Sequence, residues 1–179
     1  MNKQYFIDNN GISDQAKWLA SPNFDTRAES EISLIVIHNI SLPPNEYGGN
    51  GVIELFTNCL DPAEHPYYAE IAHLKVSSHF FIRRDGELIQ FVSCLNRAWH
   101  AGASSFQGRE RCNDFSVGIE LEGSDNHSFE SSQYDTLKDL INSLRKTYPI
   151  QHIVGHSDIA PGRKTDPGPY FDWAQINLI

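Results

Sequence analysis

The sequence has few cysteines and no long apolar run. Its 179 residues include three cysteines, Cys59, Cys94 and Cys112, and no two of them are spaced as C-x-x-C. An odd count without such a pair argues against a disulfide scaffold and against a cysteine-based structural zinc site. No apolar run approaches the roughly 20 residues of a membrane span, and the opening MNKQYFIDNNGISD lacks the apolar core of a secretory signal. These absences predict a cytoplasmic protein without a membrane partner.

Basic residues are also scarce, because 14 Lys and Arg stand against 23 Asp and Glu and give a formal net charge of −9. This acidic balance argues against nucleic acid as a partner, since nucleic-acid proteins usually carry a basic surface. The charge is uneven, however, because residues 75–111 carry six basic and three acidic side chains. Either this stretch faces an anionic ligand or it is a solvated hairpin surface.

The length and composition are those of a globular chain. With 40% hydrophobic and 21% charged residues, the sequence predicts one compact domain over residues 1–179. We expect the polar residues 1–20 to form an extension on the surface of this domain.

Short apolar runs and periodic segments predict both strands and helices. The pair of strands around Asp85-Gly86 predicts a hairpin with a type I′ turn, because this dipeptide readily takes positive φ. Apolar residues at helical spacing predict a helix over 131–148, ended by Pro149, and a short helix is expected over 52–59. Strands are predicted at 34–37, 78–83, 87–92, 115–121 and 153–154. The expected fold class is α/β or α+β, with a single sheet covered by helices.

Two histidines stand where predicted strands pass into loops. His38 follows the run 34–37, His156 follows 153–154, and Asp166 comes ten residues after His156. Two imidazoles and one carboxylate can bind zinc and leave a fourth position for water, whose pKa the metal lowers to about 7. Taken singly, each residue also has a simpler interpretation, as a hydrogen-bonded strand-end histidine or as a turn aspartate before proline.

Two more side chains suit the same chemistry. Glu120 lies on the polar face of the predicted strand 115–121 and would serve as general base towards a zinc-bound water. Lys164, two residues before Asp166, would stabilise the oxyanion of a tetrahedral intermediate. The simpler alternatives are an exposed strand carboxylate and an ordinary loop lysine.

Five segments resemble the AmpD-type N-acetylmuramyl-L-alanine amidases, relatives of phage lysozyme-type amidases and peptidoglycan recognition proteins. They follow the family's order over nearly the whole chain from about residue 20. The segments are SPNFDTR (21–27), VIHNISLPPNEYGG (36–49), EIAHLKVSSHFFIRRDGELIQFV (70–92), RAWHAGASSFQGRERCNDFSVGIELEG (97–123) and GHSDIAPGRKTDPGPYFDW (155–173). The resemblance implies a mixed β-sheet flanked by helices and one zinc ion per chain, held by His38, His156 and Asp166.

The resemblance also implies a reaction, the hydrolysis of the amide between the lactyl group of N-acetylmuramic acid and L-alanine. In this subgroup the substrate is a cytoplasmic 1,6-anhydro-muropeptide released during cell-wall recycling, and the same fragment induces β-lactamase. Glu120 would take the proton of water and pass it to the leaving amine, and Lys164 would stabilise the oxyanion. The expected partner is therefore a small muropeptide, bound by a monomer.

Four residues are expected to contact the substrate. Asn39 and His100 lie in segments, IHN and AWHAG, that match family site segments. Arg109 is expected to bind the peptide carboxylates, with Arg111 as the alternative, because a guanidinium suits bidentate carboxylate binding. Lys75 stands where the family often has Arg, which keeps the charge but loses the bidentate fork.

Two other classes of protein are alternatives to the amidase. A peptidoglycan-fragment binding module without catalysis would lack a ligand or the base, and neither is missing from the sequence. A zinc deaminase would need H-x-E and P-C-x-x-C signatures, which the sequence does not contain.

Overall fold

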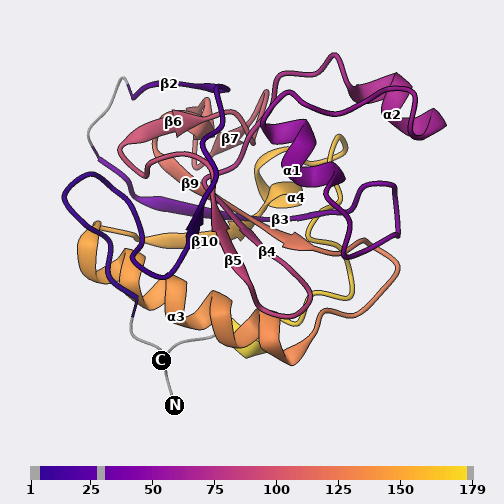
Figure 1. The fold of residues 1–179 in the computed structure, drawn as a ribbon. Coiled ribbons are helices and arrows are strands. Elements are labelled where there is room, and N and C mark those ends of the chain that lie inside the picture. The colour runs from indigo at the N-terminus through magenta and orange to yellow at the C-terminus, as the bar shows by residue number, and fades with distance from the viewer. Residues whose placement is uncertain (1–4, 28–30, 177–179) are drawn as a thin grey trace.

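The computed structural model describes residues 5–27 and 31–176. Its centre is a six-stranded sheet in the order β1-β5-β4-β9-β3-β10 (Figure 1). The strands are β1 (Lys17–Trp18), β3 (Leu34–Ile40), β4 (Phe80–Ile82), β5 (Leu88–Gln90), β9 (Ser116–Glu122) and β10 (His152–Gly155). Neighbours among β4, β9, β3 and β10 are parallel, and β4 and β5 are antiparallel. The prediction of a mixed sheet flanked by helices is confirmed.

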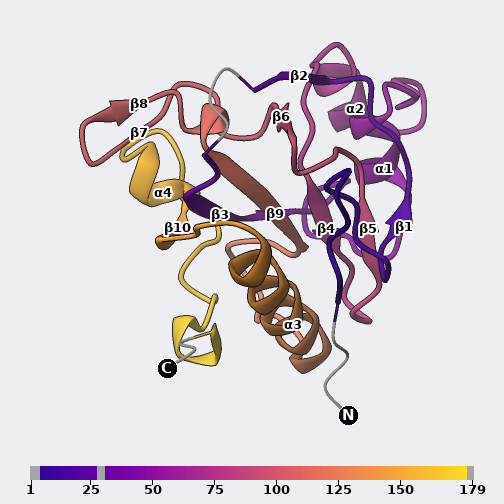
Figure 2. The same ribbon diagram turned by 90° about the vertical axis from the view of Figure 1, so that its left-hand side faces the viewer.

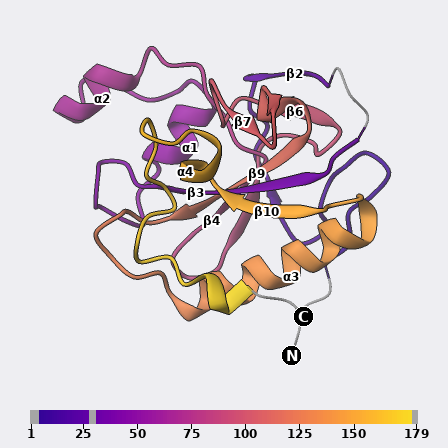
Figure 3. The ribbon, with the colours of Figure 1, turned by 180° about the vertical axis from the view of Figure 1, so that it is seen from behind.

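Helices lie on both faces of this sheet (Figure 2). The long helix α3 (Ser131–Thr147) runs beneath it, as Figure 3 shows from behind, and α1 (Gly51–Phe56) and α2 (Pro66–Ile71) lie on the other side. The helix α4 (His156–Ile159) follows β10 directly. Smaller elements complete the molecule: β2 (Phe24–Thr26) with β6 (Asn96–Ala98), β7 (Ser105–Phe106) with β8 (Arg109–Glu110), and the 3-10 helices η1 (Cys112–Asp114) and η2 (Trp173–Ile176).

Strict alternation along β3 and β9 divides the apolar core between the two faces. Ile35, Ile37, Val117 and Ile119 are fully buried in the cluster that contains the apolar residues of α3. Leu34 and Val36 belong to a different cluster, on the opposite face. Because successive side chains of a strand point to opposite faces, the even-numbered positions of both strands share the face that α3 does not cover.

The hairpin predicted around Asp85-Gly86 is present as β4 and β5, but its turn type differs from the prediction. Gly86 has φ of +87°, whereas Asp85 does not have positive φ. The N–H of Gly86 donates to the carbonyl of Arg83, and the N–H of Arg83 donates to Glu87. This longer connection needs positive φ only at its glycine, as in hairpins built on a type I turn.

Residues 5–20 do more than cover the surface, which corrects the expectation for 1–20; residues 1–4 lie outside the described part. Tyr5 and Ile7 are buried in the cluster that packs on α3. Lys17–Trp18 forms β1 at one edge of the sheet, parallel to β5. Apolar side chains spaced among polar residues thus fasten this segment to the core.

No helix in the described ranges combines the length and the apolar character that crossing a membrane requires.

Candidate active site

The register of two parallel strands brings the first two predicted site residues together. The strand β3 continues to Ile40, so His38 lies inside the strand and not at its end as predicted. Its direct partner in the parallel ladder is Glu120 of β9. Paired residues of neighbouring strands project from the same face, so both side chains point away from α3. Both are buried, with exposed fractions of 1% for His38 and 7% for Glu120.

The other two predicted ligands come from the chain after β10. Gly155 pairs with Ile37, so His156, the first residue of α4, comes beside His38. Asp166 lies in the loop that follows α4, and the N–H of Ser157 donates to its carbonyl at 2.9 Å. The carboxyl ends of parallel strands thus gather the three side chains at one edge of the sheet, as is usual for sites on such sheets.

The three side chains converge on one point through their donor atoms. Nδ1 of His38 lies 2.9 Å from Oδ2 of Asp166 and 3.0 Å from Nδ1 of His156, and the distance from His156 Nδ1 to Asp166 Oδ2 is 3.1 Å. Within residues 5–27 and 31–176, they form the one group of three such side chains placed to hold a metal ion.

The hydrogen bonds of His156 show that this group suits a cation. Its Nε2 lies 3.1 Å from the carbonyl oxygen of Ala101. A carbonyl can only accept, so Nε2 carries a proton, and in the neutral form of the ring the lone pair of Nδ1 points at the other two donor atoms. Two imidazole nitrogens and a carboxylate oxygen are a ligand set typical of zinc.

The protonation states of the group also favour a metal. Burial lowers the pKa of His38, so its ring stays neutral. Burial opposes the ionisation of Asp166, but the neighbouring imidazoles of His156 and His38 outweigh it, and the pKa of the carboxyl is lowered. Neutral imidazoles and an ionised carboxylate are the forms that bind a metal ion.

Glu120 has a different environment from Asp166. Its buried Oε2 has no hydrogen-bond partner among the described residues. Burial, and next the charge of Asp166, raise the pKa of Glu120 well above its ordinary value, while the charge of Lys164 acts in the opposite direction. A buried carboxyl with a raised pKa, beside a group of side chains placed to hold a metal ion, suits general acid–base catalysis near neutral pH.

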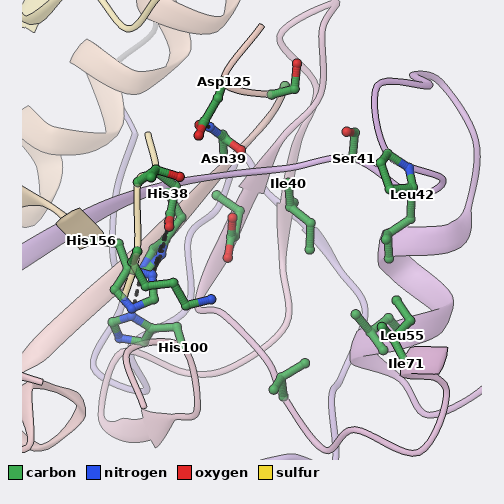
Figure 4. A pocket seen from close by; sticks show the side chains of 18 of the residues that line it. His38, Asn39, Ile40, Ser41, Leu42, Leu55, Ile71, His100, Asp125 and His156 are labelled. Carbon is green, nitrogen blue, oxygen red and sulfur yellow. Dashed lines mark hydrogen bonds and ion pairs between the residues drawn. The ribbon is translucent and has the colours of Figure 1, made fainter. Parts of the chain in front are cut away.

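These side chains line one end of a cavity of about 530 Å³. Figure 4 shows His38, His100 and His156 together at this end, and Leu42, Leu55 and Ile71 at the other. One end of the cavity is therefore polar and lined by the candidate site residues, and the other end is apolar. Lys164 and Arg163 also line it, from the loop after α4, although the guanidinium of Arg163 donates to the carbonyls of Ala101 and Ala103.

Two predicted substrate contacts line this cavity but also have partners inside the protein. The side-chain amide of Asn39 donates to Asp125 at 2.8 Å and to the carbonyl of Pro167 at 2.9 Å. Asn39 thus joins β3 to the loop that carries Asp166. The ring of His100 lies 2.9 Å from Nε2 of His38. Sequence reasoning did not reveal these partners, because they join segments far apart in the chain.

The other two predicted contacts do not line the cavity. Lys75 is exposed. Arg109 borders a separate pocket of about 130 Å³, with its guanidinium 3.8 Å from the centre of the Phe115 ring. Its alternative, Arg111, pairs with Asp114 at 3.2 Å. The basic stretch 75–111 therefore does not supply the positive charge at the cavity, which comes from the loop after α4.

Comparison with known proteins agrees with this geometry. The family model described as N-acetylmuramoyl-L-alanine amidase matches residues 28–169. The chain belongs to this amidase family. Over 167 residues it is 53% identical to the 1,6-anhydro-N-acetylmuramyl-L-alanine amidase AmpD of Escherichia coli (strain K12). The aligned region covers 92% of this chain and 91% of that protein.

Solved structures of the family have the same fold. The crystal structure of a selenomethionine AmpD derivative superposes with a TM-score of 0.92 at 54% identity, and covers 94% of this amidase and 96% of that chain. A complex of E. coli AmiD with the substrate anhydro-N-acetylmuramic acid-L-Ala-D-gamma-Glu-L-Lys superposes with a TM-score of 0.59 at 28% identity. It covers 95% of this amidase and 63% of that chain. As a member of this family, the protein is an enzyme, an amide hydrolase.

Proposed function

We propose that the protein hydrolyses the amide between 1,6-anhydro-N-acetylmuramic acid and L-alanine in muropeptides, as a zinc enzyme of peptidoglycan recycling. The observation that carries this proposal is the convergence of three side chains placed to hold a metal ion, beside the unpartnered carboxylate oxygen of Glu120. The substrate class rests on the relatives of more than 50% identity that are named for the anhydro form.

His38, His156 and Asp166 would hold one zinc ion through Nδ1, Nδ1 and Oδ2. Bound zinc supplies Lewis-acid polarisation of a carbonyl and makes water more acidic. The protein's contribution is to fix the three donor atoms before the substrate arrives. All three are buried or partly buried and come from elements held by sheet register or backbone hydrogen bonds.

Glu120 moves the proton in this mechanism. Its free Oε2 accepts a proton from the attacking water as the water oxygen bonds to the carbonyl carbon. When the carbon–nitrogen bond breaks, the same carboxyl gives that proton to the departing amine of L-alanine. A raised pKa suits both steps, because the carboxyl then takes and returns a proton at moderate cost.

Lys164 provides positive charge where the carbonyl oxygen becomes an oxyanion. Its side chain lines the cavity, and its charge acts on both His38 and Glu120. Lys164 is exposed, and an ammonium placed beside a developing negative charge stabilises it electrostatically. Lys164 is therefore our proposed oxyanion stabiliser.

The proposed setting is a cytoplasmic monomer that acts on a small muropeptide. Cys94 and Cys112 are buried and free, which suits a reducing compartment. If the same fragment induces β-lactamase, as the family resemblance implies, its hydrolysis would also lower that signal.

Incubation of the purified protein with anhydro and reducing-end muropeptides, followed by mass analysis, tests this function. We expect the anhydro substrate to yield free anhydro-N-acetylmuramic acid and an intact peptide, and a chelator to stop the reaction. Cleavage of the reducing-end substrate alone would contradict the anhydro specificity. Stoichiometric zinc with no cleavage of either would instead indicate a binding module.

Contact of Arg109 and Lys75 with the peptide carboxylates stays a prediction, since neither lines the cavity. Loss of Arg109 through Arg109→Ala should then raise KM mainly for substrates that keep their free carboxylates. Steady-state kinetics on a carboxylated and an amidated peptide check this. Equal KM changes on both peptides would count against the contact, and Arg111→Ala serves as the matched variant.

A further inference from the structure

The ring of His100 lies between His38, a proposed metal ligand, and Ser116 of the strand β9. Its Nδ1 is 2.9 Å from Nε2 of His38, and its own Nε2 is 3.1 Å from the hydroxyl of Ser116. The two rings meet edge to face, with centroids 5.0 Å apart. Both ring nitrogens of His100 are therefore used by side chains of the protein.

The position of this ring depends on the residues around it. A side chain at Gly118 would collide with it, because a Cβ there would lie 2.5 Å from Cγ of His100. The side-chain oxygen of Asn113 accepts from the backbone N–H groups of His100 and Ala101, at 3.3 and 2.8 Å. The strand β9 thus leaves room for the ring, and Asn113 fixes the backbone that carries it.

The hydrogen-bond chain specifies one tautomer for each ring when the metal is bound. A lone pair on Nδ1 of His38 for the metal leaves its proton on Nε2, which must then donate to Nδ1 of His100. His100 in turn carries its proton on Nε2 and donates to Ser116. The outer nitrogen of a metal-bound histidine usually has such an acceptor, which fixes the ring and increases its basicity.

We infer that His100 is a positioning residue, whose Nδ1 accepts the Nε2 proton of His38 and thereby presents the Nδ1 lone pair of His38 to the metal. This inference rests on the proposed zinc function. The adjacent carbonyl of Ala101 does the same for His156, with a distance of 3.1 Å to its Nε2. One short segment, residues 100–101, therefore orients both imidazole ligands.

This role differs from the substrate contact expected of His100 from the sequence. A substrate contact would affect KM and leave metal affinity unchanged. A positioning residue would affect metal affinity, and would do so in the absence of substrate. The two roles are therefore separable by measuring zinc binding alone.

Two variants of one residue test the inference. His100→Phe keeps a ring of similar size but has no acceptor, and His100→Asn places an amide oxygen near the position of Nδ1. Zinc affinity is measured by competition with a chromophoric chelator. We expect His100→Phe to weaken zinc binding about 10–100-fold and His100→Asn to stay within about threefold of the unmodified protein. His73→Phe, at an exposed histidine, is the matched control.

Further measurements separate the inference from general damage. Ser116→Ala removes the acceptor of His100 and should give a smaller loss of zinc affinity in the same direction. In the zinc-loaded protein, nitrogen-detected NMR should show the proton of His38 on Nε2. Thermal unfolding of the chelated proteins checks that each variant folds.

Unchanged zinc affinity in a folded His100→Phe protein would overturn the inference. So would a loss in His100→Asn as large as that in His100→Phe, because the acceptor would then not matter. Failure of the unmodified protein to bind zinc would instead refute the proposed zinc function itself, and with it the premise of this inference.

Discussion

At the scale of single residues, the surroundings of Glu120 and Asp166 shift the pKa values of two carboxyl groups in opposite directions. The imidazoles of His38 and His156 lie beside Asp166 and lower its pKa, whereas Glu120 keeps a buried oxygen without a partner in the described chain and has a raised pKa. One therefore suits a metal ligand and the other a proton carrier.

Glu120→Gln should separate these two tasks. The amide keeps the shape of the side chain but cannot accept a proton, so we expect turnover to fall about 10²–10⁴-fold. Zinc content should stay near that of the unmodified protein, because Glu120 is not among the three converging donors. Kinetics and metal analysis of the same sample check this. A variant with unchanged turnover would remove Glu120 from the mechanism.

His79 gives the stability of the protein a pH dependence of its own. Burial, and next the charge of Arg27, lower the pKa of this ring from 6.5 to about 3. Its Nδ1 accepts from the N–H of Gly118, and its Nε2 donates to the carbonyl of Asn96, both at 3.0 Å. The folded ring must therefore stay neutral, while the unfolded chain takes up a proton below pH 6.5.

Stability should consequently fall as the pH drops from about 6 towards 4, because the unfolded state binds more protons there. His79 alone contributes a slope of about 1.4 kcal/mol per pH unit. We expect His79→Asn, which keeps an acceptor for Gly118 but does not titrate, to reduce the slope by about that amount. Urea unfolding of the chelated proteins measures it. Identical slopes in both proteins would show that His79 is not responsible.

At the scale of elements, the sheet separates the scaffold from the site. The helix α3 packs on one face of β3 and β9, and His38 and Glu120 project from the other. Changes inside α3 should therefore affect stability and leave the chemistry unchanged.

Leu140→Ala tests this separation. Leu140 is fully buried, and its truncation should lower the free energy of unfolding by about 2–5 kcal/mol. Below the unfolding temperature, kcat and zinc affinity should match those of the unmodified protein. Asn142→Ala, at an exposed position of the same helix, should change stability by less than about 0.5 kcal/mol. A large loss of kcat in folded Leu140→Ala protein would show that the two faces are coupled.

The sequence predicted those elements whose apolar pattern is long enough to be recognised. The helix 131–148 and the strand 115–121 are confirmed as α3 and β9, within one residue at each end. The strands β1, β2, β7 and β8 have two or three residues each, too few for a period to appear. The strands β1 and β2 exist because distant strands, β5 and β6, supply hydrogen bonds, which is a long-range cause. The strands β7 and β8 pair with each other across a short turn.

Part of the candidate site could also be predicted from the sequence. The ligand types and the family motifs indicated His38, His156 and Asp166, and the structure brings their donor atoms together. The partners of His100 and Asn39 could not be predicted, since they depend on which segments meet in space. The residues expected to bind the substrate stay predictions, and two of the four do not line the cavity.

At the scale of the whole molecule, the proposed ligands connect β3 with the last part of the described chain. Zinc bound to the folded state alone would stabilise it, by about 2.7 kcal/mol when free zinc is 100 times its Kd. For a chain of this size, that corresponds to a rise in Tm of roughly 5–10 °C. The expected result is a Tm that falls by this amount on addition of a chelator.

Asp166→Ala is the control for this prediction. It should lose zinc and activity together, and its Tm should no longer respond to the chelator. Asp61→Ala, which removes an exposed carboxylate outside the cavity, should respond as the unmodified protein does. A full chelator response in Asp166→Ala would remove Asp166 from the ligand set.

The distance along the chain between the ligands also sets an order of events during synthesis. His38 precedes His156 by 118 residues, and Asp166 follows ten residues later. At about 5–20 residues per second, the ribosome needs roughly 6–24 s between the first ligand and the second. A nascent chain has no complete ligand set during that interval. If these residues hold zinc as we propose, the site is complete only after all six strands of the sheet and the loop of Asp166 have been synthesised.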